Sequence, residues 1–193
     1  MDLKKVCIIG GSFNPIHIGH LILANTVLEE LNLDEMIFVP CYIQPLKGDK
    51  DFASSTHRLE MVKLAIQSNP QFTLSDIEIN RKGKSYTVDT LKFFKKKYEN
   101  LYFVIGADNI KDFHKWKEPD TILKIANLIV TNRGGINIQI PEKIRGKKII
   151  SCTIPQIEIS STMIREKIRN GQSIKYLVPE AVENYIIQNN LYK

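Results

Sequence analysis

Hydrophobic and polar residues along this 193-residue chain form two kinds of segment that alternate. Short continuous apolar runs indicate strands that are buried on both faces, as in parallel sheets. Such runs cover residues 6–9, 36–40, 72–75, 101–105, 128–131 and 148–151. Segments with an apolar residue at every third or fourth position predict helices at about residues 21–31, 55–68, 87–98, 119–125, 162–169 and 179–188.

This alternation predicts an α/β fold, in which a parallel sheet is covered by helices on both faces. We expect a single domain over residues 1–193, with a C-terminal helical part from about residue 160. Ile136, Ile138 and Ile140 alternate with polar residues and predict an extension at an edge of the sheet. Ligands of such sheets bind beyond the carboxyl ends of the strands, so the segments that follow the strands are the first candidates for a site.

The stretch Gly10–His20 follows the first strand and leads into the first helix. Glycine allows a sharp turn and a close approach of an anion, and the helix directs N–H groups and its positive end at the same point. His17 and His20 are one helical turn apart, so their imidazoles share a face. The stretch therefore predicts a phosphate site, although its spacing is neither G-x-G-x-x-G nor a P-loop. Two incidental histidines or a zinc pair are the alternatives.

A second candidate phosphate site lies near the carboxyl end of the chain. Ser160, Ser161 and Thr162 begin a predicted helix, where hydroxyl and N–H groups can hold phosphate oxygens. Arg165 follows one turn later, and its planar guanidinium suits a phosphate. The alternative is an ordinary hydroxyl cap with a surface arginine.

Two further segments suggest contacts with a nucleotide and with an aromatic ring. Gly106 and Asp108 follow a strand, where the carboxylate can accept hydrogen bonds from ribose hydroxyls. Trp116, the only tryptophan, is favoured as a wall against which a ring stacks, with packing in the core as the alternative. The stretch Ser85–Leu91 begins a helix, where capping by Ser85 or Thr87 is the simplest interpretation.

His17-Ile18-Gly19-His20 spells the HIGH signature. With it, the chain resembles the HIGH-motif nucleotidyltransferases and, among them, the nicotinate mononucleotide adenylyltransferases, whose opening pattern G-G-x-F-x-P-x-H-x-G-H is matched at every fixed position. The later patterns I-S-S-T-x-I-R, G-A-D followed by W, and S-Y-T-x-D-T-L are also present and in order. The family's P-P-H-K is matched only in part, because Gln44 and Leu46 replace a proline and the histidine while Lys47 is kept.

The resemblance implies a Rossmann-like, doubly wound parallel sheet and an enzyme of NAD biosynthesis. It implies transfer of an adenylyl group from ATP to nicotinate mononucleotide, which gives deamido-NAD and pyrophosphate, with Mg²⁺ bound to the phosphates of ATP and no metal-ligating residue. Catalysis would depend on His17, His20, Lys47 and Arg165. The residues expected to bind ATP are Gly10, Gly11, Ser12, Phe13, His17, His20, Gly106, Asp108, Ser160, Ser161, Thr162 and Arg165. Those expected to bind nicotinate mononucleotide are Ser12, Lys47, Tyr86, Thr87, Asp108 and Trp116, with the nicotinate carboxylate at Thr87 and the nearby main-chain N–H groups.

Composition changes this interpretation little. The net charge of +6 and the pI near 9.1 are compatible with small polyanions such as nucleotides, and the lysine runs predict solvated faces rather than a nucleic-acid surface. The three cysteines show no C-x-x-C spacing, and no segment has the pattern of a signal peptide or a membrane span. We therefore expect a cytoplasmic protein that binds neither nucleic acid nor membrane; a homo-oligomer is possible.

Three alternatives stay open at this point. The first is a sister enzyme that adenylylates nicotinamide mononucleotide or phosphopantetheine, and the second is a fragment of a HIGH-type aminoacyl-tRNA synthetase, for whose tRNA-binding domain 193 residues leave no room. The third is a non-catalytic nucleotide-binding module. His57, Arg58 and His114 give only weak signals: the first two lie in a T-x-R pattern that the family shares, and His114 is expected on the surface.

Overall fold

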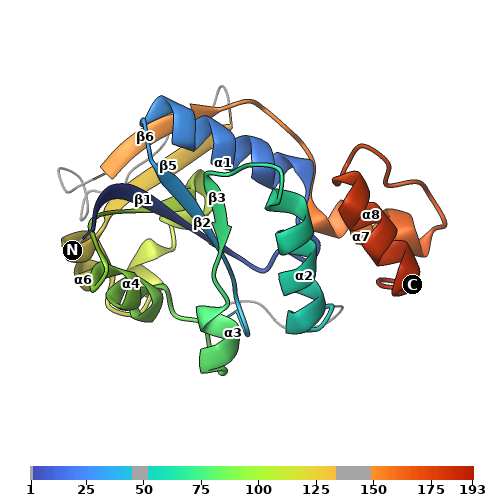
Figure 1. Cartoon of the computed structure of the whole chain (residues 1–193), viewed down its shortest axis with the longest axis horizontal. Coiled ribbons are helices and arrows are strands. Elements are labelled where there is room, and N and C mark those ends of the chain that lie inside the picture. Colours follow the sequence, from blue (N-terminus) through green and yellow to red (C-terminus); the bar gives the residue numbers. More distant parts are fainter. Residues whose placement is uncertain (1, 45–51, 134–148) are drawn as a thin grey trace.

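The computed structural model describes residues 2–44, 52–133 and 149–193. In this part of the chain, six parallel strands form a sheet in the order β3-β2-β1-β4-β5-β6 (Figure 1). Their bounds are β1 (Asp2–Gly11), β2 (Glu35–Pro40), β3 (Phe72–Leu74), β4 (Tyr98–Gly106), β5 (Asn127–Arg133) and β6 (Ile149–Ile154). The order reverses between β1 and β4, which is where doubly wound sheets open a crevice for ligands. The predicted fold class is confirmed.

Helices cover both faces of the sheet (Figure 1). On one face, α1 (Ile18–Glu30) and α2 (Ser55–Ile66) pack against the sheet, and α7 (Ser161–Arg169) and α8 (Glu180–Gln188) extend the same core beside α2. Those against the other face are α3 (Ile77–Arg81), α4 (Thr87–Lys95), α5 (Ala107–Ile110), the 3₁₀ turn η1 (Phe113–Lys115) and α6 (Pro119–Ile125). Figure 1 shows α7 and α8 together at one end of the molecule, beside α2.

The buried parts of the central strands, residues 6–9 of β1 and 101–105 of β4, are apolar because each of their faces lies against a separate core. In β1, Cys7 and Ile9 point into the core beneath α1 and α2, whereas Val6 and Ile8 point into the core beneath α4 and α6. Successive side chains of a strand alternate between the two faces, so a strand covered on both sides needs no polar position.

The differences from the predicted elements concern short segments and boundaries. The helix predicted to reach Tyr98 ends at Lys95, because Tyr98 opens β4 and pairs with Asp2 of β1. The short helices α3, α5 and η1 were not predicted, since a helix of three to five residues shows too little of its period. The edge extension predicted at residues 136–140 lies outside the described residues.

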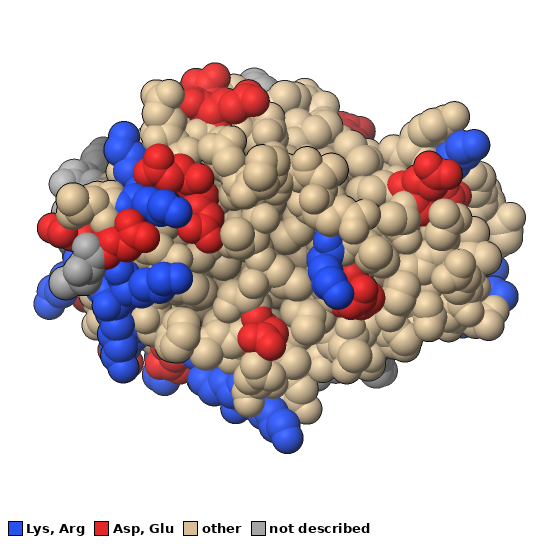
Figure 2. Space-filling view, viewed as in Figure 1, with Lys and Arg blue, Asp and Glu red and all other residues tan. Residues whose placement is uncertain are grey.

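The described part of the chain has no helix that is both long and apolar enough to span a bilayer. On the face shown in Figure 2, Lys and Arg side chains lie among Asp and Glu side chains, most densely at the end that carries α4 and α6. Charges of both signs are thus interspersed on this face rather than gathered into one basic area.

The ring of Phe13 occupies the space that a side chain at Gly11 would need. A Cβ atom at Gly11 would lie 3.1 to 3.3 Å from three atoms of that ring, and Phe13 is only 1% exposed. At the neighbouring Gly10, a Cβ atom would meet Phe103 at an ordinary 3.8 Å.

We therefore predict that Gly11→Ala lowers the free energy of unfolding by about 1–3 kcal/mol, because the buried Phe13 ring must move. Gly10→Ala is the matched control and should cost clearly less. Urea denaturation of both variants measures the difference, and equal losses would contradict the assigned packing.

Candidate active site

The two histidines of the HIGH signature lie together at the start of α1. His17 is the N-cap residue, and its backbone N–H donates to Nδ1 of His20 at 3.2 Å. The ring centroids are 3.7 Å apart, with the ring planes 31° from parallel. Because Nδ1 of His20 accepts a hydrogen bond, the neutral ring carries its proton on Nε2 and can donate it to a ligand.

Phe13 supports this pair from the interior. Its ring packs edge-on against His20 at a centroid distance of 5.2 Å and against Phe38 at 5.9 Å. The side chain of Phe13 is therefore part of the core, and only its main chain is placed to meet a nucleotide.

The start of α7 lies against the segment of residues 12–20 that leads from β1 into α1 and carries the two histidines, called the HIGH loop below. Ser161 Oγ donates to the carbonyl of Pro15 at 2.8 Å, and Arg165 Nη1 donates to the carbonyl of Asn14 at 2.9 Å. The hydroxyl of Ser160 accepts from the N–H of Met163 at 3.1 Å, so it is used as an ordinary helix cap. Thr162, like Ser160, is exposed, whereas Ser161 is partly buried.

Arg165 brings a positive charge to this loop. Its buried Nε has no hydrogen-bond partner among the described residues, nor does any carboxylate in those segments pair with the guanidinium. An anion such as a phosphate would supply both a hydrogen-bond acceptor for Nε and a negative charge to pair with the guanidinium. Histidines near the amino end and an arginine near the carboxyl end thus flank one loop, from opposite ends of the sequence.

Beside this loop, a cavity of about 530 Å³ opens at the carboxyl ends of β1, β2 and β4. Its size is that of a small-molecule site. The predicted site residues that line it are Gly10, Gly11, Ser12, Tyr86, Thr87, Gly106 and Trp116. The predicted residues thus form two neighbouring groups, one in the cavity and one at the HIGH loop, which are joined through Gly10–Ser12.

The start of α4 faces this cavity without a cap from a side chain. Tyr86 is the N-cap residue and makes no capping hydrogen bond, and Tyr86 and Thr87 both line the cavity. The hydroxyl of Ser85, a candidate cap, instead accepts from the N–H of Tyr42 at 2.9 Å. Ser85 therefore does not make the capping contact that was the simplest alternative for this stretch, and an uncapped helix start suits a carboxylate.

Trp116 lies in the cavity lining beside two other aromatic rings. Its ring centroid is 6.1 Å from that of Phe103, edge-on, and 5.4 Å from that of Phe113. The indole is partly buried and also lines the cavity. Asp108 lies in α5 after β4, and Lys47 lies outside the described residues.

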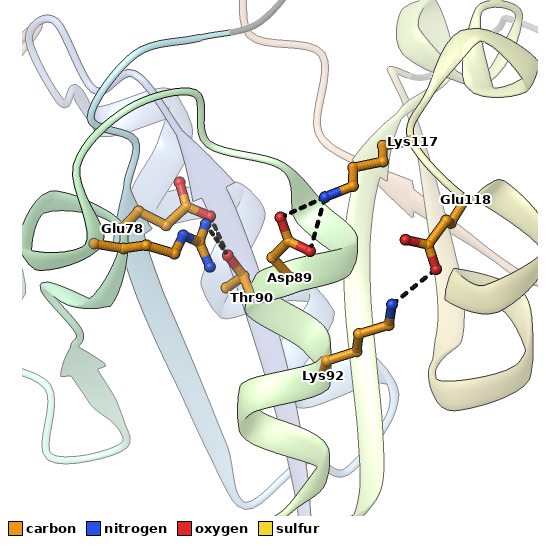
Figure 3. A network of polar contacts seen from close by, with 7 residues as sticks. Glu78, Asp89, Thr90, Lys92, Lys117 and Glu118 are labelled. Atoms are coloured by element: carbon orange, nitrogen blue, oxygen red, sulfur yellow. Dashed lines mark hydrogen bonds and ion pairs between the residues drawn. The ribbon is translucent and has the colours of Figure 1, made fainter.

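A network of polar contacts holds α4 in place (Figure 3). On one side, Thr90 donates to Glu78 of α3 and accepts from Arg81 at 3.2 Å. On the other side, Lys117 pairs with Asp89 at 3.0 Å, and Lys92 pairs with Glu118 at 2.8 Å. The contacts fix the start of α4 between α3 and the segment before α6.

Glu78 is a buried carboxyl that lines the cavity and that the sequence did not single out. Burial raises the pKa of this carboxyl, while hydrogen bonds from Thr90 and Ser85 and the charge of Arg81 act in the opposite direction. The period of a five-residue helix is too short to mark Glu78 as a buried position.

Arg58 is more central than the weak sequence signal suggested. Its side chain is 2% exposed and donates to three main-chain carbonyls: Ser12 at 2.8 Å, Ala53 at 3.1 Å and Tyr42 at 3.2 Å. It therefore joins the loops after β1 and β2 to the start of α2. The T-x-R pattern was the one signal that could have indicated this role.

Among the described residues, no group of three or more His, Cys, Asp or Glu side chains is placed to hold a metal ion. The site therefore consists of a nucleotide-sized cavity, a pair of imidazoles, a guanidinium and two helix starts at the topological switch point of a parallel sheet. This combination is typical of α/β enzymes that bind nucleotides.

Comparison with known proteins agrees with this class. The model of the cytidylyltransferase-like family matches residues 8–167. The chain is 42% identical to the nicotinate-nucleotide adenylyltransferase of Bacillus subtilis (strain 168), over 99% of this chain and 100% of that protein. It is 43% identical to a probable nicotinate-nucleotide adenylyltransferase of Thermoanaerobacter sp. (strain X514), over 98% of this chain and 94% of that protein.

A solved structure gives the same result. The nicotinic acid mononucleotide adenylyltransferase of Plasmodium falciparum, complexed with NaAD, superposes with a TM-score of 0.78 at 28% identity, and the match covers 98% of this chain and 97% of that one. The chain therefore belongs to the cytidylyltransferase-like family and, within it, to the nicotinate-nucleotide adenylyltransferases.

The buried carboxyl of Glu78 predicts a pH dependence of stability. Its pKa is raised in the folded state, so the parent loses free energy of unfolding as pH rises from below the usual value of 4.5 through the raised pKa. Glu78→Gln keeps an oxygen for Thr90 and cannot ionise. We expect its stability relative to the parent to increase with pH.

Denaturation at about pH 4 and about pH 8 measures this difference between variant and parent. Glu99→Gln, at an exposed position of β4, is the control and should show a smaller change with pH. A relative stability of Glu78→Gln that falls as pH rises would show that the carboxyl is stabilised in its ionised form.

Proposed function

We propose that this enzyme transfers the adenylyl group of ATP to nicotinate mononucleotide, giving nicotinate adenine dinucleotide (deamido-NAD) and pyrophosphate in NAD biosynthesis. The observation that carries the proposal is the meeting of two groups at Gly10–Ser12. One is a cavity with an aromatic wall and an uncapped helix start, and the other is the HIGH loop, which carries the stacked pair His17 and His20 and binds Arg165 through the carbonyl of Asn14. The solved structure of the Plasmodium falciparum relative is a complex with NaAD, which supports this proposal.

The reaction requires alignment of two anions rather than activation of a nucleophile. An oxygen of the mononucleotide phosphate attacks the α-phosphorus of ATP, the new P–O bond forms, and the bond to the β-phosphate breaks with its electron pair on pyrophosphate. The attacking oxygen is already ionised, so no general base is required. The protein must hold both phosphates close together and offset their repulsion.

The residues at the HIGH loop supply this compensation. Nε2–H of His20 would donate to an oxygen of the α-phosphate, since the His17 backbone N–H occupies Nδ1. Arg165 and the first-turn N–H groups of α7 would bind the β- and γ-phosphates. His17 and Lys47 complete the proposed catalytic set, and Gly106 with Asp108 would bind the nucleoside of ATP.

We propose that Mg²⁺ enters bound to ATP. The described residues provide no three-membered acidic or histidine cluster, so the phosphate oxygens would supply most of its ligands. The ion would neutralise part of the charge on the leaving pyrophosphate. The imidazoles and the guanidinium supplement this charge from the protein side.

The acceptor would occupy the cavity. Its pyridine ring would stack on Trp116, and its carboxylate would accept hydrogen bonds from the start of α4 at Tyr86 and Thr87. Ser12 lies between the cavity and the HIGH loop, where the acceptor phosphate must reach ATP. We further propose a cytoplasmic location, since none of the three cysteines, all in the described part of the chain, forms a disulfide.

The acceptor preference tests this function directly. With ATP and Mg²⁺, we expect pyrophosphate release with nicotinate mononucleotide, and a kcat/KM lower by about tenfold or more with nicotinamide mononucleotide, whose amide carries no charge for the start of α4. Phosphopantetheine should give no release. Release with phosphopantetheine alone would favour the sister enzyme, and no release with any acceptor would favour a non-catalytic module.

His20→Ala tests the transition-state role of the imidazole. We expect kcat to fall about 100-fold or more while ATP binding changes little, because the donor acts mainly on charge that develops during the reaction. Exposed His114, whose ring contacts the carbonyl of Lys111, provides the control in His114→Ala. Equal losses in kcat and in ATP binding would contradict this role.

A further inference from the structure

The last residues of the described chain return to the HIGH loop. Ile18 N–H donates to the carbonyl of Leu177 at 3.0 Å, and the hydroxyl of Tyr192 donates to Oδ1 of Asn14 at 2.8 Å. The residues of the second contact are 178 positions apart in the sequence. Figure 1 shows how α7 and α8 bring this end of the chain beside α2.

Asn14 is the point at which these contacts meet. The residue is 1% exposed, and its Oδ1 accepts from Tyr192 and also from the N–H of Ala53 at 3.0 Å. Its main-chain carbonyl accepts from Arg165 at 2.9 Å. One residue thus links the loop that carries the histidines, the loop before α2, the arginine of α7 and the C-terminal tyrosine.

The hydroxyl of Tyr192 is suited to remain a hydrogen-bond donor to Oδ1 of Asn14. Its ring packs against the core beneath α1 and α2, and burial raises the pKa of its hydroxyl, which the nearby charges of Arg165 and Arg58 only partly oppose. The hydroxyl therefore keeps its proton. An amide oxygen can only accept, so it needs a protonated partner.

We propose that Tyr192 is a positioning residue for adenylyl transfer: its hydroxyl orients Asn14 and thereby the carbonyl at which Arg165 is held against the HIGH loop. This inference rests on the proposed function, because it concerns the ATP side of the same site. Tyr192 lies behind Asn14 and is absent from the lining of the acceptor cavity. Its removal should therefore affect ATP and not the acceptor.

The chain offers a matched control in Tyr185. The hydroxyl of Tyr185 lies 2.9 Å from Nδ1 of His57, so it also ties the C-terminal part to α2. Its ring contacts the same core, but its hydroxyl touches no residue of the HIGH loop. A role limited to anchoring the C-terminal helices would give Tyr185→Phe and Tyr192→Phe the same effect.

The experiment compares the two variants with the parent in steady-state kinetics. We expect Tyr192→Phe to lower kcat/KM for ATP about five- to tenfold, the scale of one lost hydrogen bond at a buried polar group, with the KM for nicotinate mononucleotide within about twofold of the parent. Tyr185→Phe should leave both parameters within about twofold. Equal effects of the two variants on ATP, or no effect of Tyr192→Phe, would overturn the proposal.

A double-mutant cycle tests whether Tyr192 acts through Asn14. In an Asn14→Ala background, Tyr192→Phe should cause a further loss of less than about twofold, because the acceptor of its hydrogen bond is gone. A full additional loss would show that Tyr192 acts elsewhere. Thermal unfolding of each variant confirms that only folded proteins are compared. If Asn14→Ala does not fold, the comparison of Tyr192→Phe with Tyr185→Phe still tests the role of Tyr192.

Assays of the unmutated protein distinguish a failure of this inference from a failure of the proposed function. Failure of the parent to use nicotinate mononucleotide would refute the function alone. In that case, binding of a non-hydrolysable ATP analogue, measured by calorimetry, gives the same comparison without an acceptor. Tyr192→Phe should then weaken binding about threefold or more, and Tyr185→Phe should not; equal affinities would overturn the role of Tyr192.

Discussion

The sharp turn between β1 and α1 carries main-chain carbonyls into the protein, and the rest of the site depends on how these are satisfied. The carbonyl of Ser12 accepts from Arg58 of α2, that of Asn14 from Arg165 of α7, and that of Pro15 from Ser161 of α7. Buried carbonyls without partners would cost more free energy than the turn could recover. The turn therefore needs two helices beyond its own to keep its shape.

The same donors give the loop its chemistry. A guanidinium that holds a carbonyl keeps its positive charge, so the groups that stabilise the turn also create a positive environment beside His17 and His20. The positive end of α1 points at the same place. Packing and catalysis thus use one set of contacts, which is why the HIGH loop and the start of α7 must fold together.

The acceptor side is built in a different way. The start of α4 is left uncapped toward the cavity and is fixed instead by contacts on its flanks, to Glu78 on one side and to Lys117 and Glu118 on the other. The ring of Trp116 is held in position by its contacts with the rings of Phe103 and Phe113. The two halves meet at Gly10–Ser12, at the reversal of strand order, where the sheet itself leaves room for two substrates.

The sequence by itself determined the strands, the longer helices, the fold class and the four motifs, because apolar runs and local motifs are properties of neighbouring residues. Motif spacing was enough to mark His17, His20, Arg165, Thr87 and Trp116 as candidate site residues. It did not indicate Glu78, Asn14 or Tyr192, and it gave Arg58 little weight, since their roles arise from contacts across many residues. Tertiary structure alone decided which hydroxyl caps a helix and which holds a carbonyl, because a hydrogen bond depends on which segments the folded chain brings within about 3 Å.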